Sequence, residues 1–193
     1  MQHEELEHES IESKPPNTPN ELSPLDILSA QAALTKLSSG EKLSDDEAKK
    51  LGEMPTSMLQ NENIWPIYSG FWIKLDSVME PARTLWNSMP ADMQKAVYNT
   101  FAPLQFFVSI GILDLKDVSD EEVNKMDKEK IKNAGWAVKI FALIDPEVKA
   151  IRPLLNAAIK AGNKQILVNE MLKTEIREAR VRDDNEDVAK KAA

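Results

Sequence analysis

The segment that decides the fold is residues 64–79, which read IWPIYSGFWIKLDSVM. Within this segment, large apolar side chains recur at positions i, i+3, i+7, i+10 and i+14, namely Trp65, Tyr68, Trp72, Leu75 and Met79. This spacing follows the 3.6-residue period of an α-helix. It predicts a helix with one aromatic stripe, which has Pro66 in its first turn and is ended or kinked by Pro81.

Aromatic residues stay dense beyond this helix. Residues 64–107, which we call the aromatic segment, hold three of the four tryptophans, both tyrosines and four of the five phenylalanines. Phe71 and Ile73 lie off the main stripe, so the helix is apolar on more than one side. Such surface is buried in a core, on a partner or in lipid. We therefore predict an interface with another protein or an oligomer partner, made of Trp65, Tyr68, Phe71, Trp72, Phe106 and Phe107.

Helix start and stop signals punctuate the rest of the chain. Ser23-Pro24 and the capping box at Ser44 each predict a helix start, and Gly40 predicts a helix end. A second capping box at Ser119 and the pair Asp145-Pro146 predict further starts, whereas Asn-Gly and Asp-Gly hairpin turns are lacking. The pattern predicts an all-α fold, an irregular bundle of about seven helices with Pro-kinked central helices and polar tails.

Composition divides the chain into three regions. Residues 1–23 are Glu-rich and then Pro-rich, which predicts a mobile acidic tail. Residues 24–176 are expected to form the helical domain, with an N-terminal helical hairpin (24–53), aromatic-rich core helices (61–113) and C-terminal helices (119–176). Residues 177–193 are charged, and we expect them to form a tail that frays.

The net charge of −8 is concentrated at one end, because residues 1–21 carry six glutamates against one lysine. The main basic stripe interleaves with acids, and it consists of Lys125, Lys128, Lys132 and Lys139. Nucleic-acid binding is disfavoured, since it needs a concentrated basic face. The N-terminus has neither a basic n-region nor an apolar h-region, so we expect no Sec signal peptide. These features favour a cytoplasmic protein or one within a cytoplasmically assembled particle.

Residues with catalytic chemistry are sparse. The chain has no cysteine, its only histidines are His3 and His8 in the acidic tail, and its six glycines never cluster. We predict no catalytic residues, no cofactor and no metal site. The enzymatic alternative is the carboxylate pair Asp76 and Glu80, which stand four residues apart in an apolar helix. We expect both of these to face solvent opposite the aromatic stripe.

Residues 96–113 contain no charge, and this length just reaches that of a membrane span. The stretch also contains Asn99, Pro103 and Gln105, and acids rather than a basic cluster follow it. We interpret it as a buried central helix, and peripheral membrane association through it and residues 65–73 is the alternative.

The sequence as a whole predicts a non-enzymatic interaction protein. Its role would be that of an assembly, adaptor or inhibitor component, including one in a large viral or phage-type assembly. Its partner would be another protein or copies of itself. A peripheral membrane protein is the second interpretation, and an enzyme using Asp76 and Glu80 is the third.

Overall fold

The computed structural model describes residues 23–163, 166 and 169–192, and this part of the chain is all-α without a strand. The all-α prediction is confirmed. Eight of the helices have seven residues or more. The helices are α1 (Pro24–Ser39), α2 (Asp45–Gly52), α3 (Thr56–Leu59), α4 (Trp65–Val78), α5 (Glu80–Ser88), α6 (Ala91–Thr100), α7 (Ala102–Ser109), α8 (Asp120–Asn124), α9 (Lys128–Lys132), α10 (Gly135–Lys160) and α11 (Glu170–Ala192). None of these helices is long and apolar enough to cross a membrane.

Two of the predicted helix starts carry their caps. The Ser23 hydroxyl accepts a hydrogen bond from the backbone N–H of Asp26, and Ser44 and Glu47 form a reciprocal capping box. Gly40 ends α1 with a φ of 78°, a backbone conformation that glycine adopts at little cost. Ser119 precedes α8, but its side chain makes no cap hydrogen bond.

The structure divides the chain into more helices than the sequence indicates. The aromatic helix ends before Pro81, one of the two outcomes expected there, and Pro103 separates two helices instead of kinking one. Pro81 lies in the first turn of α5 and Pro103 in the first turn of α7. A proline fits there, since the first-turn N–H has no intrahelical acceptor. The prediction of a helix start at Asp145-Pro146 is wrong: Pro146 and Pro153 both lie inside α10.

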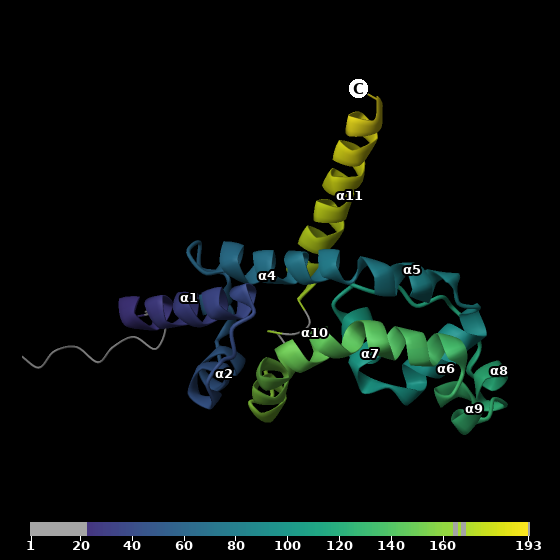
Figure 1. Ribbon diagram of the computed structural model, residues 1–193. Helices are drawn as coiled ribbons and strands as arrows, with labels where there is room; N and C mark the ends of the chain where they lie inside the picture. Colours follow the sequence, from purple (N-terminus) through teal and green to yellow (C-terminus); the bar gives the residue numbers. More distant parts are fainter. Residues whose placement is uncertain (1–22, 164–165, 167–168, 193) are drawn as a thin grey trace, which may run out of the picture.

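Helix α10 is the longest element and runs along the body of the molecule, changing direction along its length (Figure 1). It packs on α2 towards one end and on α5 and α9 towards the other, while α1 packs on α2 and α4. The contact with α2 is close at Gly52, where an added Cβ would lie 2.6 Å from the Ala157 backbone. The absence of a side chain at Gly52 is what permits this approach.

The core is built largely from the aromatic segment. Trp72, Trp86 and Phe107 are fully buried. The uncharged residues 96–113 supply further core side chains, with Val97, Leu104 and Ile110 fully buried. This stretch is therefore core, as the sequence indicates, but it forms α6 and α7 with an extended Phe101 between them instead of one helix.

Helix α11 runs straight through the predicted domain boundary at residue 176. It packs on α4 through Leu172, Ile176 and Ala179, and then projects away from the body (Figure 1). The prediction that the chain frays after residue 176 is wrong, because α11 continues to Ala192. The predicted acidic tail, with both histidines, lies outside the described residues apart from Ser23, which caps α1.

Candidate functional site

The six predicted interface residues lie together in one aromatic cluster. The ring of Trp72 is central to it, with ring-centroid distances of 6.1 Å to Tyr68, 4.9 Å to Phe71 and 5.8 Å to Phe106. Trp65 joins the cluster through Tyr68 at 5.9 Å, and Phe107 joins through Phe106 at 5.6 Å. Separations of this size allow favourable tilted and edge-to-face ring contacts.

Most of this cluster is inside the protein. Tyr68, Phe71, Trp72 and Phe107 are buried, whereas Trp65 and Phe106 are partly buried against the same core. Burial raises the pKa of Tyr68 above its usual value, so its hydroxyl stays protonated. The chain's own packing thus accounts for four of the six side chains, and the predicted partner contact at them stays a prediction.

The two carboxylates of the enzymatic alternative have different surroundings. Glu80 is exposed, and its Oε2 accepts a hydrogen bond from Arg83 Nη1 at 2.5 Å. Asp76 is only 4% exposed, which contradicts the prediction that it faces solvent. The reason is positional: Asp76 follows Trp72 by four residues and precedes Met79 by three, so it lies on the buried stripe.

Asp76 is held by two arginines from different helices. Its Oδ1 accepts hydrogen bonds from Arg83 Nη2 at 2.6 Å and Arg180 Nη2 at 2.5 Å, and its Oδ2 accepts from Arg180 Nε at 2.8 Å. The guanidinium of Arg180 therefore grips the carboxylate with two nitrogens, the strong geometry for this pair. Both oxygens are engaged, which argues against Asp76 acting as a catalytic acid or base.

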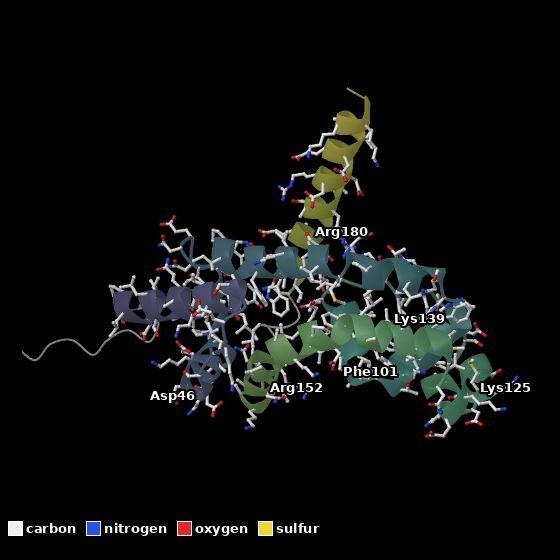
Figure 2. The ribbon with its side chains drawn as sticks, viewed as in Figure 1. Asp46, Phe101, Lys125, Lys139, Arg152 and Arg180 are labelled. Atoms are coloured by element: carbon white, nitrogen blue, oxygen red, sulfur yellow. The ribbon has the colours of Figure 1, made fainter. Side chains whose placement is uncertain are left out.

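The same two arginines also bind the loop that follows α7. Arg180 donates to the carbonyl oxygens of Gly111 at 2.8 Å and Ile112 at 3.0 Å, and Arg83 donates to that of Ile112 at 3.2 Å. Figure 2 shows Arg180 where α11 crosses α4. This polar cluster ties four parts of the chain together at the base of α11: α4, α5, the loop and α11 itself.

A second anchor of α11 lies near the start of α4. The indole N–H of Trp65 donates to Glu175 Oε1 at 2.5 Å. Ile176 and Ala179 are buried between the two anchors, and Leu172 is buried one turn before the first of them. Residues 170–180 are therefore held by apolar burial, by one tryptophan hydrogen bond and by Arg180.

Residues 181–192, which we call the arm, differ from residues 170–180. Every side chain from Val181 to Lys191 is exposed, including Val181 at 59% and Val188 at 67%. The ion pair between Glu186 and Lys190 supports the helix locally, at 3.7 Å and with i,i+4 spacing. A short helix without tertiary packing is marginal in water. A second surface covering the arm would stabilise it.

A groove of about 720 Å³ between α2 and α10 is another candidate site, and Asp46 and Arg152 in Figure 2 mark its two sides. Its acids come from α2 and the turn after it, while its cations are shared between α2 (Lys49) and α10 (Lys149, Arg152 and Lys160). The two signs of charge are mixed along the groove. It therefore offers no preference for an anionic ligand such as a nucleic acid.

Neither Arg180 nor the arm is among the site residues that the sequence predicts. A signal for a helix that reaches Arg180 was present, since the apolar spacing Leu172, Ile176 and Ala179 continues past the predicted boundary.

Among the described residues there is no group of three or more His, Cys, Asp or Glu side chains that could hold a metal ion. A scan against protein-family models and searches of curated proteins and solved structures each found no match.

Proposed function

We propose that the protein is a non-enzymatic interaction protein, a component of a protein assembly, and that the arm of α11 is its docking element. The observation that carries this proposal is the exposure of every side chain from Val181 to Lys191 on a helix that leaves the body. Helices with an unpaired apolar stripe are common docking elements, because a partner buries the stripe. The partner is another protein or a copy of this chain, in the cytoplasm or in a particle assembled there.

The arm replaces the aromatic cluster as the proposed contact surface. Trp72 and Phe107 are fully buried in this chain, so a partner could reach them only after partial unfolding. The membrane alternative loses support for the same reason, since it required residues 65–73 and 96–113 to insert into lipid. The enzymatic alternative is weakened by the two arginines that occupy Asp76.

Site-specific photo-crosslinking tests this proposal. A photoreactive amino acid is placed at Val188 on the arm, and in a matched variant at Val78, which is 52% exposed on the body. Both variants are irradiated in extracts of the cells that contain the protein. We expect covalent adducts with a protein chain from position 188 and few from position 78. Equal adduct yields at the two positions would contradict the proposal.

A further inference from the structure

The outer face of α11 carries a regular pattern of side chains. Thr174, Val181 and Val188 follow one another at seven-residue intervals, so they lie on one side of the helix. This side is opposite to the one that Leu172 and Ile176 bury against α4. All three residues are exposed, and so is Met171 at 49% on the flank of the same side. This stripe of one threonine and two valines therefore points away from the body between Thr174 and Val188.

Charges alternate in sign on each flank of this stripe. On one flank Arg177 is followed seven residues later by Asp184, and on the other flank Glu178 is followed four residues later by Arg182. All four are exposed, and Arg177, Glu178, Val181 and Arg182 surround a shallow hollow of about 430 Å³ on the helix surface. On each flank Val181 thus lies between two opposite charges, Arg177 before it and Asp184 after it on one flank, and Glu178 before it and Arg182 after it on the other.

We propose that the protein forms a homodimer in which α11 packs antiparallel against α11 of a second copy, with the two-fold axis close to Val181. This inference rests on the proposed function and specifies its partner. Around this axis Val181 meets the partner's Val181, and Thr174 lies level with the partner's Val188, with Met171 less than one turn further along the flank. Such an interface is isologous, so every contact other than the one on the axis occurs twice.

The charges match in this arrangement. An axis perpendicular to both helices places each flank beside the same flank of the partner. Arg177 then faces the partner's Asp184, and Glu178 faces the partner's Arg182. Glu170, at the start of α11, comes beside the partner's Lys191. The symmetric repeat doubles each of these pairs, and a series of opposite charges favours this register over others.

A parallel pair of the same helices would not match. In a parallel coiled coil with Thr174, Val181 and Val188 at position d, a g residue faces the e residue five positions later on the partner, and each a residue faces the partner's same a residue. Here Arg177 is at g, Arg182 is at e and Glu178 is at a. That geometry brings Arg177 against the partner's Arg182, and the two Glu178 side chains against each other. Like charges at these positions oppose pairing, so the charge pattern selects the antiparallel orientation.

The body of each copy leaves room for this contact. The arm extends beyond α4 (Figure 1). In the antiparallel pair the partner's arm covers the outer face of residues 170–180, and the partner's body lies beside this arm, on the side of the partner helix that faces away from it. The side chains of residues 181–191, which are exposed in the single chain, would gain a covering surface in each copy. Pairing therefore supplies the missing stabilisation of a helix that is marginal alone.

Charge reversal tests the register. The full chain and its variants are compared by sedimentation over a wide range of concentrations. We expect the unaltered protein to dimerise, and Asp184→Arg to raise the dissociation constant about tenfold or more, because two attractive pairs become repulsive. Adding Arg177→Asp to Asp184→Arg should restore the dimer. Asp183→Arg is the matched control, since it makes the same charge change on the opposite side of the helix and should leave the dissociation constant unchanged.

Engineered cysteines test the orientation, and the lack of native cysteine makes them unique probes. Val181→Cys lies at the axis, so mild oxidation should give a covalent dimer, because a disulfide needs Cβ atoms about 4 Å apart. Val188→Cys lies two turns from the axis and should give little. Equal crosslinking of both variants would show a parallel pair and overturn the proposal.

The outcomes separate this inference from the proposed function. A chain that stays monomeric at every concentration, or a swap variant that does not regain the dimer, overturns the antiparallel homodimer. If position 188 nevertheless captures a different protein on irradiation, the arm is still a docking element and the proposed function stands. If position 188 captures no protein above the control position, the proposed function fails as well.

Discussion

The aromatic segment and the C-terminal helix differ in opposite ways from what the sequence predicts: the first is more buried than expected, and the second is more ordered. The aromatic segment, rich in tryptophan and phenylalanine, resembles a surface made for a partner, yet Trp72 and Phe107 are fully buried. The charged C-terminus resembles a fraying tail, yet α11 is a 23-residue helix that projects from the body. A high frequency of large apolar side chains in the sequence therefore indicates where a core can form. Exposure follows from how many faces the neighbouring helices cover.

The sharpest test of this contrast is Trp72→Ala. Trp72 is fully buried and contacts three other rings, so its removal should lower the free energy of unfolding by about 4 kcal/mol. Urea unfolding followed by circular dichroism measures the change. Trp136→Ala, at a position 39% exposed on α10, is the control and should cost far less. If Trp72→Ala left the stability intact and abolished association, the aromatic segment would be the interface after all.

A smaller effect is expected where the two regions join. Asp76→Ala leaves Arg83 and Arg180 without their shared carboxylate at a buried position, and it should cost about 3 kcal/mol. Glu80→Ala, at a carboxylate whose side chain is 64% exposed, should change stability by about 0.5 kcal/mol or less. Thermal unfolding of the two variants gives the comparison. Similar losses for both would mean that Asp76 is not the residue that anchors α11.

The smallest effect distinguishes the two sides of α11. Glu175→Ala removes the acceptor of the Trp65 indole N–H and should cost about 1 kcal/mol of stability. Glu178→Ala, three residues later on the outer face, should cost about 0.5 kcal/mol or less in folding. The order should reverse for self-association measured by sedimentation, where Glu178→Ala has the larger effect. The same order in both measurements would contradict the division of α11 into an anchored side and a docking side.

Local signals in the sequence predicted the parts of the fold that depend on local chemistry. The caps at Ser23 and Ser44 and the stop at Gly40 were readable because each involves residues within a few positions of one another. The buried role of residues 96–113 was predictable from their lack of charge. These features establish the fold class and several helix boundaries.

The parts that the sequence did not reveal depend on contacts between distant residues. The hydrogen-bonded ion pair between Arg180 and Asp76 joins residues 104 positions apart, and no periodic pattern in the sequence indicates such a pair. Likewise, the position of Gly52 against Ala157 of α10 explains why a side chain is absent there, and the two residues are far apart in the chain. The burial of Asp76, in contrast, could be inferred from its four-residue spacing to Trp72, although the sequence was interpreted as placing Asp76 in solvent.

The two prolines inside α10 have a consequence for the shape of the molecule. Pro146 and Pro153 are seven residues apart and so lie on one side of the helix, while Ile144, Val148 and Ile151 on the other side are buried. Because proline has no N–H, the carbonyls of Ala142 and Lys149 lack their intrahelical donors. A helix bends where such hydrogen bonds are missing, and α10 changes direction along its length (Figure 1). A straight helix of this length, about 39 Å, could pack closely on the rest of the chain along only part of its length. The bent α10 instead contacts both α2 and α5, so one continuous helix holds these two separate parts of the molecule together.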